Sequence, residues 1–193
     1  MPDFNAIAED LYAQGWSLRP HFLSPALVGS LRADLAEGEY LNPAGIGRDA
    51  AQQRNVDIRT DSIRWLDDRQ PAEREFLALM ERLRLFINQR LLLGLFDYEA
   101  HFSRYAPGDF YRRHVDAFHQ HGADSKPRRV LTSVVYLNTE WSAADGGELL
   151  LWDHGGVELM RLQPAAGAAV FFMSEEFPHE VLPARRERLS IAG

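Results

Sequence analysis

The sequence predicts a mainly β fold, a double-stranded β-helix or jelly roll, flanked by about three α-helices that precede it. In residues 1–95 the apolar residues recur at helical spacing, whereas residues 96–193 contain short β-rich runs separated by turn signals. The 193 residues, 46% of them hydrophobic, are enough for one sizeable core. We therefore expect a single domain over 1–193, with mostly helical support in its first half.

Helical signals come first along the chain. Residues 7–12 show helical spacing, and Ser24 followed by Pro25 places a capping residue and a first-turn proline before a helix over 27–35. A third helix is predicted from residue 70, and its apolar positions at i, i+4, i+7 and i+11 indicate a stripe that covers one face of a sheet. These positions are Phe76, Met80, Leu83 and Ile87.

The β-rich part divides into eight predicted strands. Glycine- and proline-containing turns at 107–108, 145–147, 155–156 and 164 separate several of them. The predicted strands cover residues 99–105, 111–115, 129–138, 148–152, 157–161, 168–173, 180–182 and 188–192.

Composition and charge limit the classes of function that the sequence is compatible with. The formal net charge of −7 and the sequence pI near 5.5 argue against a general nucleic-acid or membrane-surface binder, because attraction to phosphate needs a basic face. Cysteine is absent, so any metal must be held by His, Asp or Glu. The chain shows no basic and apolar leader at its start and no long apolar stretch, and we expect a cytoplasmic protein.

The most informative short motif is the H-x-D formed by His114 and Asp116. Residues i and i+2 of a strand point to the same face, so the imidazole and the carboxylate can converge on one point. One neutral nitrogen and one anionic oxygen are two members of the 2-His-1-carboxylate triad that holds non-haem Fe(II). A lone H-x-D recurs by chance, and a second histidine is required.

His179 supplies that histidine, and Arg188 follows it nine residues later. With His114 and Asp116, this constellation resembles the iron(II)/2-oxoglutarate-dependent dioxygenases, and among them the prolyl 4-hydroxylases closest to the hypoxia-inducible-factor prolyl hydroxylases and their bacterial relatives. The resemblance covers roughly residues 58–193. It implies that His114, Asp116 and His179 bind Fe(II), with 2-oxoglutarate and O2 as cosubstrates and ascorbate as a candidate further cofactor.

The resemblance also assigns residues to the cosubstrate. An arginine suits the far carboxylate of 2-oxoglutarate because a guanidinium can make two parallel hydrogen bonds. In the family this arginine stands nine residues after the distal histidine, which selects Arg188 over Arg185 and Arg186. Tyr136 matches a tyrosine that binds the same carboxylate, and Tyr105 resembles the tyrosine of a Y-P-G turn near the cosubstrate.

Three further residues resemble parts that hold a peptide. Arg59 and Asp61 lie in a stretch like the substrate-covering loop of the prolyl hydroxylases, here around 45–66, and Arg129 matches an arginine that contacts the substrate chain. The implied reaction is hydroxylation of a prolyl residue in a protein, with decarboxylation of 2-oxoglutarate to succinate and CO2. Bacterial relatives act on elongation factor Tu, which makes that protein a candidate substrate.

Two other functions remain open. One is a dioxygenase that acts on a small molecule, and the other is a cupin-like metal-binding jelly roll without oxygenase chemistry, which would need the histidines but neither Arg188 nor Tyr136.

The chain also stops at Gly193, inside what should be the last strand, where relatives continue.

The remaining histidines are expected to be bystanders. His119 and His121 could compete for metal, but they fall in a polar loop and are expected to be solvated. The others have no partner at ligand spacing and are expected to have ordinary surface or core roles; they are His21, His101 and His154.

Overall fold

In the computed structural model, the described residues are 2–37, 41–45, 55, 57–116 and 129–193. The helices are α1 (Phe4–Gln14), α2 (Pro25–Glu37) and α3 (Pro71–Leu91), with a short 3-10 turn η2 (Ala143–Asp145). The strands are β1 (Trp16–Arg19), β2 (Asn42–Pro43), β3 (Ser62–Trp65), β4 (His101–Tyr105), β5 (Tyr111–His114), β6 (Leu131–Tyr136), β7 (Leu149–Trp152), β8 (Glu158–Leu162), β9 (Ala169–Met173), β10 (His179–Val181) and β11 (Arg188–Ala192). None of the helices among these residues is both long and apolar enough to cross a bilayer.

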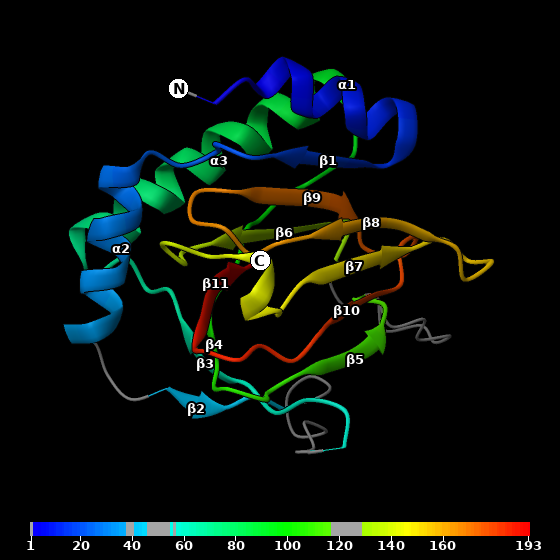
Figure 1. The fold of residues 1–193 in the computed structure, drawn as a ribbon. Coiled ribbons are helices and arrows are strands. Elements are labelled where there is room, and N and C mark those ends of the chain that lie inside the picture. Colours follow the sequence, from blue (N-terminus) through cyan, green and yellow to red (C-terminus); the bar gives the residue numbers. More distant parts are fainter. Residues whose placement is uncertain (1, 38–40, 46–54, 56, 117–128) are drawn as a thin grey trace.

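The strands form two antiparallel sheets. The larger has seven strands in the order β1-β9-β6-β11-β4-β3-β2, and the smaller has four in the order β5-β10-β7-β8. Figure 1 shows the smaller sheet facing one side of the larger sheet, with the helices on the other side of the larger sheet. Strands distant in sequence lie side by side, as when β11 inserts between β4 and β6. This arrangement confirms the mainly β fold with helices at its N-terminal side.

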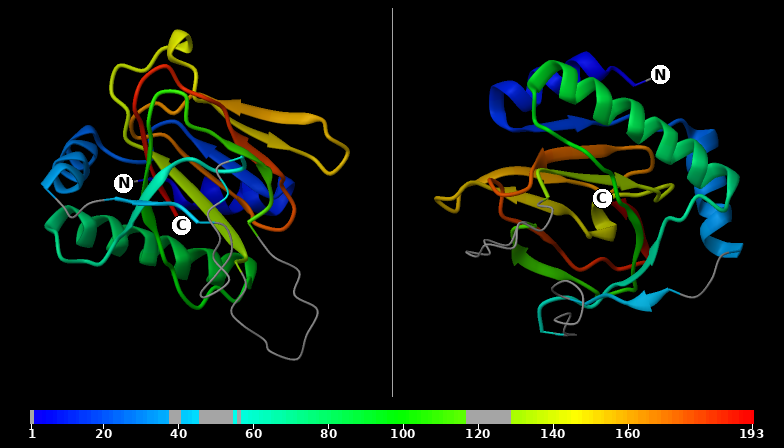
Figure 2. Two further views of the ribbon diagram at one scale, coloured as in Figure 1. Left: turned by 90° about the horizontal axis from the view of Figure 1, so that it is seen from below. Right: turned by 180° about the vertical axis from the view of Figure 1, so that it is seen from behind.

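The helices cover the outer face of the seven-stranded sheet, and α3 runs across this face in the rear view of Figure 2. The alternation of side chains along β6 explains the layer. Val135 points to the helices and packs with Phe76 and Ile87 of α3, whereas Val134 and Tyr136 belong to a second core on the other face. The apolar stripe predicted for the third helix is thus buried in the outer core.

The second core lies between the two sheets. It contains residues from β4, β6, β7, β9 and β10. The main members of this core are Tyr105, Val134, Tyr136, Leu149, Leu151, Val170, Phe172 and Val181. Of the predicted cosubstrate residues, Tyr105 and Tyr136 belong to this core.

All eight predicted strands are present with boundaries shifted by a few residues, but they do not include β1, β2 or β3. Gly15, with φ of 78°, ends α1 in the left-handed conformation and turns the chain into β1, which pairs with β9. A Cβ atom on Gly15 would lie 2.8 Å from a ring carbon of Phe177. The turn therefore depends on glycine for both its backbone conformation and its space.

Candidate active site

The three predicted metal ligands converge. His114 is the last residue of β5, His179 is the first residue of β10, and these two residues are opposite each other in the antiparallel pairing. Asp116 lies in a bend after β5, so it is off the strand on which the H-x-D spacing had placed it. His114 Nε2 is 3.5 Å from Asp116 Oδ1, and His179 Nε2 is 3.7 Å from Asp116 Oδ2. One potential ligand atom from each residue lies within 4.8 Å of the others.

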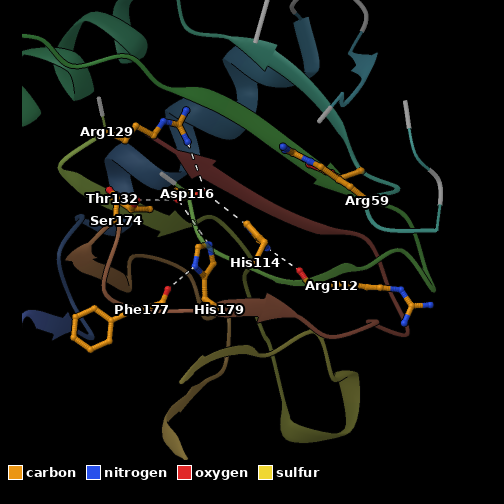
Figure 3. A network of polar contacts seen from close by, with 10 residues as sticks. Arg59, Arg112, His114, Asp116, Arg129, Thr132, Ser174, Phe177 and His179 are labelled. Atoms are coloured by element: carbon orange, nitrogen blue, oxygen red, sulfur yellow. Dashed lines mark hydrogen bonds and ion pairs between the residues drawn. The ribbon is translucent and has the colours of Figure 1, made fainter. Parts of the chain in front are cut away.

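Main-chain carbonyl groups fix the orientation of both imidazoles (Figure 3). His114 Nδ1 is 2.7 Å from the carbonyl oxygen of Arg112, and His179 Nδ1 is 3.1 Å from that of Phe177. A carbonyl oxygen only accepts, so each Nδ1 carries a hydrogen, and Nε2 is the nitrogen that can bind a metal when the ring is neutral. Burial, with a contribution from His114, lowers the pKa of His179 to about 4. His179 is therefore neutral near pH 7, as a metal ligand must be.

Asp116 is held by hydroxyl groups. Thr132 of β6 donates from Oγ1 to Asp116 Oδ2 at 2.8 Å, and the Ser174 hydroxyl is 2.8 Å from the same Thr132 oxygen. Partners of this kind fix the orientation of a ligating carboxylate. Thr132 therefore supports the candidate ligand from the larger sheet.

The charge of Asp116 is also supported. Arg129 NH1 is 3.9 Å from Asp116 Oδ1. Burial acts to raise the pKa of Asp116, but His179, His114 and Arg129 outweigh it and hold this pKa well below its usual value. The carboxylate and the two imidazoles match the donor set of a facial Fe(II) site.

Thr132→Val is expected to weaken metal binding by about 10- to 100-fold, because the carboxylate loses the hydrogen bond that orients it. The measurement is competition for Fe(II) or Mn(II) with a chelating dye under anaerobic conditions. Thr139→Val, which alters an exposed threonine, is the matched control and should bind metal like the wild type. Equal affinities in the two variants would show that Thr132 does not support the site.

The predicted cosubstrate arginine is fully buried. Arg188 is 1% exposed, its Nε donates to the carbonyl oxygen of Gly147 at 2.9 Å, and its NH1 donates to Ser190 Oγ at 3.3 Å. Its NH2 has no hydrogen-bond partner among the described residues. A buried guanidinium that forms no ion pair with the described residues calls for an anion, since an unpaired buried cation is costly.

Tyr136 faces this guanidinium. The carbon CZ of Arg188 is 5.1 Å from the Tyr136 ring and 4.9 Å from the Tyr105 ring. The Tyr136 hydroxyl is buried without a hydrogen-bond partner in the described part of the chain. Burial raises the pKa of Tyr136 to about 12, against the opposing effect of Arg188, so the phenol keeps its proton. An unpaired N–H and an unpaired O–H side by side fit a carboxylate.

This pair lies in the same layer as the metal triad. The ring of Phe172, which shares the inner core with Tyr136, is 4.7 Å from the ring of His179. Arg188 is paired with Tyr105 across β11 and β4, while His179 is on the facing sheet. The structure therefore brings all three predicted cosubstrate residues together, and connects them to the triad through packed aromatic rings.

The predicted Arg59–Asp61 pair is formed. Arg59 donates from Nε and NH2 to the Asp61 carboxylate at 2.6 and 2.9 Å, and Asp61 is 1% exposed. The Arg59 guanidinium also lies 4.7 Å from the Tyr111 ring, which stacks on His114 at 3.5 Å between centroids. Arg59 thus lies beside the metal centre. Its role toward substrate stays a prediction.

Arg59→Met is expected to lower the free energy of unfolding by roughly 3 kcal/mol, because it leaves the buried Asp61 carboxylate without its partner. Arg104→Met is the control, since Arg104 and Glu187 form an exposed pair whose loss should cost about 1 kcal/mol or less. Urea denaturation of both variants measures the difference. Equal losses of unfolding free energy in the two variants would mean that the buried Arg59–Asp61 pair stabilises the fold no more than an exposed ion pair does.

The remaining predicted residues are Arg129 and four of the other histidines, and they differ in where they lie. Arg129 lies 3.9 Å from Asp116 and 3.7 Å from Glu99, so it borders the candidate metal site, and its role toward substrate stays a prediction. His119 and His121 lie outside the described residues, and His21 and His154 are exposed, as expected.

Sequence reasoning missed several residues of the site. Thr132 could have been found as a polar residue on the inward face of an apolar strand, in alternation with Val134 and Tyr136. Ser174 and Tyr111 carried no comparable signal. His101, expected to be a bystander, is 5% exposed and lies on the same face of β4 as Tyr105.

The comparisons with known proteins agree with this geometry. Residues 100–193 match the model of the 2OG-Fe(II) oxygenase superfamily. The crystal structure of a prolyl-4-hydroxylase from Pseudomonas putida is 46% identical, with a TM-score of 0.86, and the match covers 99% of this chain and 97% of that one. A Trichoplax adhaerens prolyl hydroxylase in complex with a hypoxia-inducible-factor peptide fragment is 25% identical, with a TM-score of 0.80 over 98% of this chain and 86% of that one.

Longer relatives are also similar. The hypoxia-inducible factor prolyl hydroxylase of Caenorhabditis elegans is 29% identical over 155 residues, which is 70% of this chain but 19% of the relative. This chain therefore spans about a fifth of the length of that protein. The resemblance inferred from the H-x-D, His and Arg motifs is confirmed, as is the jelly-roll fold shared with these structures.

Proposed function

Since this chain belongs to the 2OG-Fe(II) oxygenase superfamily, whose members use Fe(II), 2-oxoglutarate and O2, we propose that it hydroxylates a prolyl residue in a protein or peptide. One observation carries the proposal. A triad that could hold a metal lies in the same inter-sheet layer as Arg188 and Tyr136, each of which has a buried polar atom without a partner among the described residues. The first set fits Fe(II), and the second fits the carboxylate of a cosubstrate.

The residues of the chain have separable tasks. His114, Asp116 and His179 would hold the metal, and Arg188 with Tyr136 would orient 2-oxoglutarate by its far carboxylate. When bound, Fe(II) and 2-oxoglutarate supply the oxidative chemistry, in which the cosubstrate is decarboxylated to succinate and CO2. The apolar inner core excludes water around them.

A protein substrate is favoured over a small molecule. The Arg59–Asp61 pair lies beside Tyr111 and His114, where the resemblance places a substrate-covering loop. A similar structure, that of the Trichoplax enzyme, was solved with a peptide fragment. Elongation factor Tu is the candidate that we put first, because bacterial relatives act on it, and a cytoplasmic location belongs to the same proposal.

The alternative functions meet specific difficulties. A cupin-like metal protein without oxygenase chemistry would give no reason to bury the Arg188 guanidinium without an anion. A small-molecule dioxygenase would use the same triad and cosubstrate residues, so only a substrate test separates it from the proposed prolyl hydroxylase.

The test is incubation of the protein with Fe(II), 2-oxoglutarate and O2 together with purified elongation factor Tu and a library of proline-containing peptides. Mass spectrometry should find one added oxygen atom on a prolyl residue, formed in step with succinate. His179→Ala should give neither product. Succinate release that responds only to small metabolites, with no peptide oxidised, would favour the small-molecule alternative.

A further inference from the structure

His101 is a buried imidazole that the proposed chemistry leaves unused. It is the first residue of β4 and is 5% exposed. Within the described part of the chain, neither its Nδ1 nor its Nε2 has a hydrogen-bond partner. Leaving a buried polar group unpaired is costly, so such a side chain calls for an explanation, and a bound molecule that supplies the partner is one.

The side chain of His101 lies on the inner face of the sheet. Phe102 packs in the outer core beneath the helices, so its neighbours on β4 point the other way, toward the layer that contains Tyr105. The charged groups that act on His101 are Arg59, Arg129 and Asp116. All three belong to the surroundings of the metal triad. His101 therefore borders the same site.

His101 and the cosubstrate residues lie at opposite ends of β4. Arg188 is opposite Tyr105 in the pairing of β11 with β4, whereas His101 is opposite Ala192, four residues further along the strand. Four residues of strand span roughly 13 Å. On its other side His101 is opposite Trp65 of β3, whose ring is 5.0 Å away and which is 48% exposed. His101 is thus far from the Arg188 end and close to the surface.

The hydrogen-bonding capacity of His101 is well defined. Burial, together with Arg59 and Arg129 and against Asp116, lowers its pKa to about 3, so the ring is neutral. A neutral imidazole offers one donor and one acceptor. The ring of a prolyl residue has no polar atom, but the main chain beside it offers carbonyl oxygens and, from the next residue, an N–H group. A neutral imidazole can donate to such a carbonyl oxygen and accept from such an N–H group. It would bind a carboxylate less strongly than a cationic side chain would.

We propose that His101 is a substrate-positioning residue that hydrogen-bonds the main chain of the bound proline-containing peptide beside the metal centre. The proposal rests on the proposed prolyl hydroxylase function and adds a residue to its substrate site. It also explains why a polar ring is kept unpaired in the free protein, since the peptide supplies the missing partner.

The test compares His101→Leu, which removes both polar atoms at similar volume, with His101→Gln, which keeps a donor and an acceptor. The probe is the proline-containing peptide that the wild type hydroxylates best in the library. Its dissociation constant is measured by fluorescence anisotropy on protein loaded with Mn(II) and 2-oxoglutarate, which does not turn over. The KM values for peptide and 2-oxoglutarate are measured separately on the Fe(II) form. His154→Leu, at an exposed histidine, is the matched control.

We expect His101→Leu to raise the dissociation constant and the KM of the peptide about tenfold, and His101→Gln to recover most of this loss. The KM for 2-oxoglutarate and the metal affinity should change less than about twofold. The melting temperature of His101→Leu should equal or exceed that of the wild type, because an unpaired buried polar group has been removed.

Three results would overturn the proposal. Unchanged peptide affinity in a folded His101→Leu variant would mean that the imidazole does not contact the peptide. A rise in the KM for 2-oxoglutarate alone would assign His101 to the cosubstrate. Failure of the wild type to bind or oxidise any peptide would instead remove the proposed function, and the positioning role with it.

Discussion

Replacing Arg188 with Leu should raise the 2-oxoglutarate concentration needed for half-maximal turnover by about 100-fold or more, because a buried charge pair with the cosubstrate is lost. The guanidinium is already oriented by Gly147 and Ser190, and its NH2 has no hydrogen-bond partner among the described residues. Binding of a carboxylate then adds hydrogen bonds at little cost in side-chain entropy. The measurement is initial rate against 2-oxoglutarate concentration at saturating Fe(II).

Two further variants separate charge from geometry. Arg188→Lys keeps the charge but cannot make two parallel hydrogen bonds. Its KM for 2-oxoglutarate should therefore lie between that of Arg188→Leu and that of the wild type. Tyr136→Phe removes a single unpaired hydroxyl and should raise the KM about tenfold. Circular dichroism verifies that the Arg188→Leu variant is folded. An unchanged KM for 2-oxoglutarate in this folded variant would contradict the assignment of Arg188 to the carboxylate of 2-oxoglutarate.

His179→Ala and Asp116→Ala should each lower turnover by at least about 1,000-fold, since the metal carries the chemistry and the site loses one of three ligands. The two changes remove different groups, an imidazole nitrogen of β10 and a carboxylate oxygen from the bend after β5. Iron content after anaerobic loading and desalting, measured by colorimetric assay, should fall in parallel with activity. His154→Ala is the control.

Retention of stoichiometric iron and full activity in either variant would contradict the triad. A variant that keeps its iron but loses turnover would show instead that the group orients a reactant and does not hold the metal. Thermal melting of the metal-free proteins shows whether a loss of iron has a trivial cause in unfolding.

Much of the fold was predictable because local pattern and tertiary environment agree. The stripe of Phe76, Met80, Leu83 and Ile87 has one helical face and is buried on that face. Strand β1 was missed because its four residues carry no clear alternation, and it is a strand only through its pairing with β9 after the turn at Gly15. Such pairing depends on contacts distant in the sequence, which a local pattern does not encode.

The same distinction holds for the site. The triad and Arg188 could be identified because the chemistry demands fixed residue types at recognisable spacing. The details that set their orientation could not be. The hydrogen bond from Thr132 to Asp116 joins β6 of the larger sheet to the bend after β5 of the smaller one, and the placement of Asp116 beyond the end of β5 follows from where that strand stops. Only the fold shows that His101 is buried without a hydrogen-bond partner among the described residues.

The most direct test of the central claim is an anaerobic titration of the Fe(II)-loaded protein with 2-oxoglutarate, followed by visible absorption. The triad and the Arg188–Tyr136 pair together predict a weak, saturable charge-transfer band from chelation of the 2-oxo acid to the metal. The band should be lost in His179→Ala and should need far more 2-oxoglutarate in Arg188→Leu. Bound iron with no band at any concentration would contradict the account, and would favour a metal-binding jelly roll without oxygenase chemistry.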